Sequence, residues 1–123
     1  MKIYTSYFGN MKNIPEGIVP ISIAGKAPEF YTGLEYKVLA PKLWFFREWK
    51  ENHDNQFYID CYEEYVLKNL FPEMTKEVLY IMSHYRDVVL LCYEKPGEFC
   101  HRHLVADWFK RNGIEVEELD ANS

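Results

Sequence analysis

The segment 87–94, "DVVLLCYE", constrains the fold of this chain most, because it is apolar almost throughout. A strand with one face in water alternates apolar and polar side chains, whereas a strand covered on both faces is a short, nearly continuous apolar run. Strands of the second kind belong to parallel sheets that lie between layers of other elements. The segment therefore predicts the central strand of an α/β fold.

Strand-like and helix-like patterns alternate along the rest of the chain. Residues 2–8, 18–24 and 114–119 are short runs rich in β-branched or aromatic side chains, which predict further strands. The spacing of apolar residues predicts helices that begin near residues 41, 55, 75 and 100. Helices between strands favour parallel pairing, so we expect an α/β sandwich whose right-handed, mostly parallel sheet has about four or five strands.

Local signals mark the ends of these helices. Asp54 or Asn55 can cap the second helix, and Thr75 can cap the third. Gly113 stands at the C′ position where glycine commonly ends a helix.

Length and composition are those of one globular domain over residues 1–123. The chain is 48% hydrophobic and 27% charged and contains no repeat or long linker. No apolar run approaches the roughly 20 residues of a membrane span, and the first ten residues resemble a strand more than a signal peptide. We therefore expect a cytoplasmic protein with no membrane partner. Three cysteines, an odd number, favour reduced thiols over a disulfide framework.

The net charge of −5 argues against broad binding to nucleic acid. Counterion release, which drives such binding, requires clustered Lys and Arg side chains. A phosphate-bearing small molecule or a single nucleic-acid end remains a possible partner through a local basic site.

Cys100, His101 and Arg102 stand where the last helix begins. Backbone N–H groups lack helix partners at that position and the helix dipole is positive, which suits an anion. In parallel sheets ligands bind at the carboxyl ends of the strands, where the loop after Cys92 must lie. The segment therefore predicts an anion-binding site.

A projection at about 100° per residue separates the two histidines of this helix. His101 falls within its apolar face and points inward, whereas His103 falls on the exposed side. Either His101 is a buried imidazole that fixes the loop through a hydrogen bond, or it contacts a ligand and moves a proton. The apolar face consists of Leu104, Val105, Trp108 and Phe109.

The neighbours of His101 also have two interpretations each. Arg102 is either an anion clamp or the partner of Glu94 or Glu98 in a surface ion pair. Cys100 is either a packed thiol or a nucleophile whose pKa the helix N-terminus lowers. Cys92 lies inside the apolar strand, which favours packing, although it is close enough to the strand end to reach the same pocket.

Three better-known kinds of site are not favoured. Zinc would recruit Cys92, Cys100 and a histidine, but this spacing is unusual for a structural zinc site and Cys100 is adjacent to His101. A cysteine phosphatase loop requires a particular number of residues between its cysteine and its arginine, and neither Cys92 nor Cys100 has that separation in sequence from Arg102. The phosphate and dinucleotide glycine motifs are absent too, so we expect neither metal nor cofactor.

The stretch "LLCYEKPGEFCHRHLVADW" closely resembles the signature of domain-of-unknown-function family 488. In that family a strand ending Leu-Leu-Cys-x-Glu precedes a Cys-His-Arg triplet that opens a helix, and "LAPK", "YTSYFGN" and "ISIAGKAP" also resemble its shorter members. The resemblance implies a Rossmann-like three-layer fold but no agreed activity. The residues that it marks are Cys92, Glu94, Cys100, His101 and Arg102.

The end of the first strand departs from that family. Many members of that family have an Asp-x-Arg pattern where this chain has Thr5, Ser6 and Tyr7. If that acid and base take part in the chemistry of the family, the resemblance implies that this chemistry is altered or absent here. Ser6 and Tyr7 can donate hydrogen bonds to a ligand at the same strand end. Lys26, after the second strand, can add positive charge or be a solvated loop residue.

These observations favour a domain that binds a nucleotide or nucleic-acid phosphate at the helix beginning near Cys100. Arg102 would hold the anion and His101 would fix the loop. If the protein is an enzyme, Cys100 is the candidate nucleophile and Glu94 the candidate acid or base. The alternative is a non-enzymatic binding or structural module in which the Cys-His-Arg triplet only organises the loop.

Overall fold

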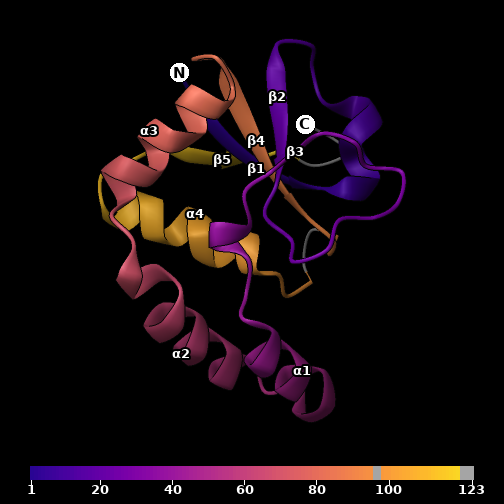
Figure 1. The fold of residues 1–123 in the computed structure, drawn as a ribbon, viewed down its shortest axis with the longest axis vertical. Coiled ribbons are helices and arrows are strands. Elements are labelled where there is room, and N and C mark those ends of the chain that lie inside the picture. The colour runs from indigo at the N-terminus through magenta and orange to yellow at the C-terminus, as the bar shows by residue number, and fades with distance from the viewer. Residues whose placement is uncertain (96–97, 120–123) are drawn as a thin grey trace.

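The computed structural model describes residues 1–95 and 98–119. Its sheet has five strands in the order β3-β2-β4-β1-β5, and every neighbouring pair is parallel. This confirms the α/β class and the Rossmann-like sandwich (Figure 1). The strands are β1 (Ile3–Tyr7), β2 (Ile18–Ser22), β3 (Leu34–Glu35), β4 (Asp87–Cys92) and β5 (Val116–Glu118).

Strand β4 is the centre of the sheet, as its apolar sequence predicts. It pairs with β2 on one side and β1 on the other, and its residues 88–92 are buried. The register places Cys92 beside Tyr7 at the carboxyl ends of β4 and β1. The residues that follow β1 and β4 therefore lie at the same end of the sheet.

The described residues also contain four α-helices. The second helix, α2, begins at Asn55 as expected and ends at Tyr65, before a 3-10 turn. The third, α3, begins at Pro72 and not near residue 75. Proline suits the first turn because its missing N–H has no helix partner there, so Thr75 is buried inside α3 and is not its cap. The helices are α1 (Leu43–Asn52), α2 (Asn55–Tyr65), α3 (Pro72–Met82) and α4 (His101–Arg111).

The two faces of the sheet are covered by different layers. Ile3, Val88 and Leu90 belong to the main core, which includes Val105 and Phe109 of α4. Val89 and Leu91 point the other way, into a smaller core with Phe8 of the 3-10 helix η1 (Phe8–Asn13) and with Tyr31. The third layer is thus made by η1 and the connection after β2, while α3 and α4 cover the main core (Figure 1).

Helices α1 and α2 extend away from the sheet and form one wall of the recess described below (Figure 1). Their packing is mainly aromatic: the Phe45 and Tyr58 rings meet edge to face, 5.4 Å between centroids. Tyr62 anchors α2 to the body of the molecule, because its hydroxyl donates to the carbonyl oxygen of Leu39 at 2.5 Å.

None of the helices in the described part of the chain has the length and hydropathy to cross a membrane.

Candidate functional site

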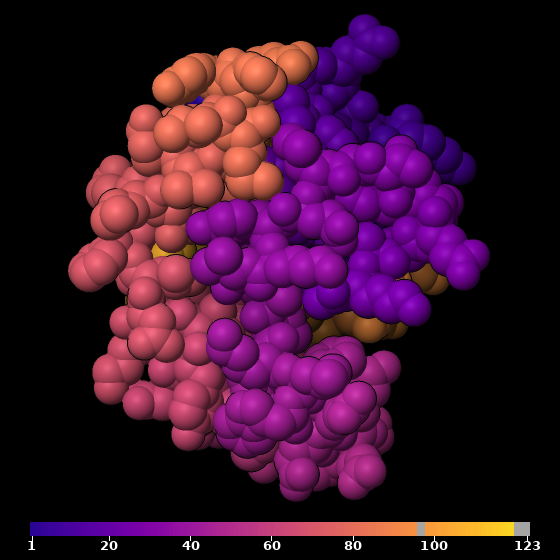
Figure 2. Space-filling model, viewed as in Figure 1, coloured from indigo at the N-terminus to yellow at the C-terminus, as the bar shows by residue number. Residues whose placement is uncertain are grey.

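A cavity of about 590 Å³ lies at the carboxyl ends of β2 and β4, where the parallel sheet predicts a site. Its walls come from the segment after β2, from α1 and α2, and from residues on both sides of the loop between β4 and α4. Figure 2 shows a recess between the body and the α1 arm, with atoms of the segment after β4 behind it. Aromatic and basic side chains line it, among them Lys26, Phe46, Trp49, Lys50, Tyr58, Tyr93 and Phe99.

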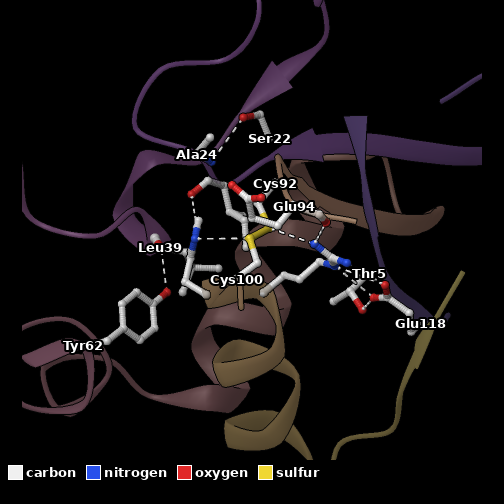
Figure 3. The surroundings of a disulfide bond; sticks show 12 residues. Thr5, Ser22, Ala24, Leu39, Tyr62, Cys92, Glu94, Cys100 and Glu118 are labelled. Carbon is white, nitrogen blue, oxygen red and sulfur yellow. Dashed lines mark hydrogen bonds and ion pairs between the residues drawn. A yellow bond between two sulfur atoms is a disulfide. The ribbon is translucent and has the colours of Figure 1, made fainter. Parts of the chain in front are cut away.

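Cys92 and Cys100 meet at the inner end of this cavity and form a disulfide (Figure 3). The expectation of reduced thiols is therefore wrong for this pair, and holds only for the buried Cys61. Cysteine number alone does not show that the end of β4 and the start of α4 lie side by side. Both cysteines are buried residues.

His101 is buried, and it joins the start of α4 to the segment after β2. Its Nε2 lies 2.7 Å from the carbonyl oxygen of Ile23, just after β2. A carbonyl can only accept, so Nε2 carries the hydrogen, and Nδ1 lies 3.9 Å from Sγ of Cys100. Burial, more than any nearby charge, lowers the pKa of His101 to about 4, so the ring is neutral at neutral pH. His103 lies on the exposed side of α4, as the helical projection predicts.

Arg102 is completely buried, and its guanidinium is occupied by the protein itself. Nε and Nη2 donate to the Glu118 carboxylate at the end of β5, with Nη2 2.9 Å from Oε2. Nη1 donates to the Glu94 carbonyl oxygen at 2.5 Å and to Sγ of Cys92 at 3.2 Å. The ion pair expected with Glu94 or Glu98 is made with Glu118, and Arg102 does not line the cavity. Arg102 thus holds the loop between β4 and α4 in place through its hydrogen bond to the Glu94 backbone.

Glu94 lines the cavity and is partly buried. Burial first, and then the neighbouring Glu98 carboxyl, raises the pKa of Glu94 above its ordinary value. A raised pKa makes a carboxyl a stronger base and keeps its proton to a higher pH, which suits a residue that acts as acid or base.

The remaining residues expected at the site separate into two groups. Lys26 lines the cavity, and its backbone oxygen accepts a hydrogen bond from Tyr93. Ser6 is fully buried and donates to the Leu119 carbonyl oxygen at 2.5 Å. Tyr7 contacts the Arg102 guanidinium through its ring, 5.8 Å from the centroid. The structure does not bring Ser6 and Tyr7 to the cavity.

Sequence reasoning missed the α1 wall and the partner of Arg102. Lys50 and Trp49 follow an ordinary amphipathic pattern, which indicates a helix but not what its faces meet. Glu118 stands in a short acidic strand, where a charged side chain carries no sign of a buried partner.

Cys92, Cys100 and His101 are also the group that offers donor atoms for a metal ion in the described part of the chain. Their Sγ and ring nitrogen atoms all lie within 4.8 Å of one another, and all three residues are buried. Two sulfurs and an imidazole are ligands that zinc prefers.

Comparison with known proteins identifies the family. Residues 18–113 match DUF488-N3a, described as the active DUF488-N3 subclade. No curated protein and no solved structure matches the chain significantly. The match includes β2, β4, α4 and the whole Cys-His-Arg segment. The chain therefore belongs to the DUF488 family, within its DUF488-N3a group.

Proposed function

We propose that this protein binds an anionic ligand with a flat ring system, a nucleotide or a nucleic-acid phosphate end, in the cavity at the start of α4. The observation that carries the proposal is the lining of the cavity, which combines two lysines with five aromatic rings. Its volume of about 590 Å³ is that of a small-molecule site. Aromatic side chains stack on nucleobases, and ammonium groups attract phosphate.

Lys26 and Lys50 take the anion in this proposal. They stand on different walls of the cavity, one after β2 and one on α1, so a phosphate between them meets positive charge from two sides. The N-terminus of α4 adds the positive end of a helix dipole, because Cys100 and His101 line the cavity. Arg102 supports the site indirectly, because it fixes both Cys92 and the Glu94 backbone.

The catalytic part of the proposal rests on the thiol of Cys100 in the reduced protein. Cys100 precedes the first turn of α4, where the helix dipole stabilises a thiolate. The thiolate would attack an electrophilic atom of the bound ligand, and Glu94 would give a proton to the leaving group. The description of the matched subclade as active agrees with an enzyme.

Ligand binding can be tested by thermal unfolding. Phosphate and adenosine 5′-monophosphate should raise the melting temperature above that in chloride at equal ionic strength. A ligand that binds only the folded state, at 100 times its dissociation constant, stabilises that state by about 2.7 kcal/mol. The double variant Lys26→Ala/Lys50→Ala should lose this increment, whereas Lys12→Ala, at an exposed lysine outside the cavity, should keep it. An unchanged increment in the double variant would refute the assignment.

The same experiment separates Arg102 from the anion site. Arg102→Ala should lower the melting temperature in every buffer, because it removes the ion-pair partner of Glu118, and should keep the phosphate increment. Loss of the increment in a folded Arg102→Lys variant would return the anion-binding role to Arg102.

A non-enzymatic module is the second candidate, and the contacts of the triplet favour it. His101 donates to the Ile23 carbonyl oxygen, and Arg102 donates to the Glu94 carbonyl oxygen and the Glu118 carboxylate. Both side chains therefore bind the protein's own framework.

Alkylation by iodoacetamide after reduction distinguishes the two functions. An enzyme thiol should be alkylated at neutral pH faster than a free small thiol, and Cys100→Ser should abolish that rate while Cys61→Ser leaves it unchanged.

A further inference from the structure

We infer that the reduced protein binds one zinc ion through Cys92, Cys100 and His101 at the inner end of the cavity. The donor atoms of these three residues already lie within 4.8 Å of one another, and all three residues are buried. The inference does not depend on which ligand occupies the rest of the cavity.

The orientation of His101 is that of a metal ligand. Its Nε2–H is bound to the Ile23 carbonyl oxygen at 2.7 Å, which leaves the Nδ1 lone pair 3.9 Å from Sγ of Cys100. Histidines that bind metal almost always donate their other ring N–H to a carboxylate, a carbonyl or water, which fixes the tautomer and the ring. The backbone after β2 supplies that second contact here.

Adjacent ligands are compatible because Cys100 is not part of the helix. It is the N-cap of α4, with extended backbone angles of φ −152° and ψ 146°, while His101 is the first helical residue. The change of backbone direction between them brings both side chains to the same point beside Cys92. The spacing argument against zinc therefore does not apply to this fold.

The charge around the sulfurs also favours thiolates. Nη1 of Arg102 lies 3.2 Å from Sγ of Cys92, and the remaining guanidinium charge is balanced by Glu118. A guanidinium beside a thiol stabilises its deprotonated form, which is the form that binds metal. Two thiolates and one neutral imidazole neutralise Zn²⁺ and match its preference for sulfur and nitrogen.

Three protein ligands leave one tetrahedral position open. Catalytic zinc sites have this composition, whereas structural sites use four protein ligands. Because all three residues line the cavity, the open position would face it, where water or an anionic group of a ligand can enter. With the ion bound, Cys100 is a ligand, so the nucleophile proposed above belongs to the metal-free reduced protein.

Zinc and the disulfide exclude each other, because they use the same two sulfurs. A phosphine opens the disulfide by taking oxygen from one water molecule, whose two hydrogens give the two thiols. In a cell, two small thiols supply the same two electrons and become a disulfide. Binding of Zn²⁺ then releases the two thiol protons.

Cobalt substitution tests the site directly. The full chain is reduced with a phosphine, freed of metal and reductant without oxygen, and titrated with Co²⁺ alone. We expect a sulfur-to-cobalt charge-transfer band and the visible bands of tetrahedral Co²⁺, complete at one equivalent and displaced by Zn²⁺. The oxidised protein should give no such bands.

Variants identify the ligands. Cys92→Ser, Cys100→Ser and His101→Gln should each lose the one-equivalent spectrum, whereas Cys61→Ser should keep it because Cys61 is the cysteine outside the cluster. Circular dichroism shows which variants fold. If His101→Gln does not fold, the two serine variants are enough to test the site. No sulfur-to-cobalt band in the reduced protein, or a band that survives in both serine variants, overturns the inference. Phosphate stabilisation measured in chelator then shows separately whether the proposed function stands.

Discussion

His101 is the residue in which sequence position, burial and chemistry are most closely linked. Its place in the apolar face of α4 turns it inward, and burial then makes the protonated ring unfavourable. The hydrogen bond to Ile23 satisfies the buried N–H and ties the start of α4 to the end of β2. One imidazole thus holds two walls of the cavity together.

This burial predicts a pH-dependent stability. The pKa of His101 falls from 6.5 to about 4 on folding, so the unfolded chain binds more protons between these values. The contribution is complete above pH 6.5 and is lost as the pH falls toward 4, at up to about 1.4 kcal/mol per pH unit. Urea unfolding in chelator should show this loss in the wild type, and His101→Gln should lack it.

His103→Gln is the matched control, because His103 lies on the exposed side of the same helix. Partial burial also lowers the pKa of His103, so this variant should lose a part of the wild-type dependence, whereas His101→Gln should lose the larger part. Equal pH dependence in the wild type and His101→Gln would show that another group is responsible.

At the scale of the element, the ends of the helices decide where the site residues stand. Cys100 caps α4 through its backbone alone, with no side-chain hydrogen bond, so its sulfur is free to meet Cys92. The α2 helix is capped instead by a side chain: Oδ1 of Asp54 accepts from the backbone N–H groups of Gln56 and Phe57. Asn55, the other candidate, accepts from Nε1 of Trp49 and so joins α1 to α2.

Asp54→Ala should therefore destabilise the protein by about 1 kcal/mol, the usual cost of losing an N-cap. Asp54→Asn should retain most of the stability, because the asparagine oxygen can accept the same two hydrogen bonds. Denaturant midpoints of the three proteins measure the effect. A loss in Asp54→Asn as large as that in Asp54→Ala would mean that charge, not the cap, is what Asp54 contributes.

At the scale of the whole molecule, residues from three parts of the chain hold α4 in place beside the cavity. The segment after β2 supplies Ile23, the end of β4 supplies Cys92, and β5 supplies Glu118 for Arg102. The Cys92–Cys100 disulfide closes the loop between β4 and α4. The loop is thus held at its two ends by a covalent bond, and Arg102 holds it near its start, at the Glu94 carbonyl oxygen.

Reduction should lower the stability of the molecule. A bridge across eight residues of separation restricts the unfolded chain, a contribution of about 2–3 kcal/mol in the chain-entropy account. In chelator, a phosphine should lower the urea midpoint of the wild type and of Cys61→Ala, but not that of Cys92→Ala. A wild-type midpoint indifferent to the phosphine would contradict this expectation.

The sequence by itself determined the fold class, the central strand and the inward direction of His101. These follow from local periodicity, because a run such as "DVVLLCYE" must be covered on both faces and a helix must bury its apolar face. The Cys-His-Arg segment likewise placed the chain in its family. Periodicity states which face an element buries.

Only the tertiary structure decided what those faces meet. The pairing of Arg102 with Glu118, the contact of Cys92 with Cys100, and the approach of Lys50 to the cavity all join residues from different elements. Charged and sulfur-containing side chains have no period that identifies a partner, so the sheet order and the packing of α1 and α2 had to be known first. The same order placed Ser6 and Tyr7 outside the cavity, although they lie at the same end of the sheet.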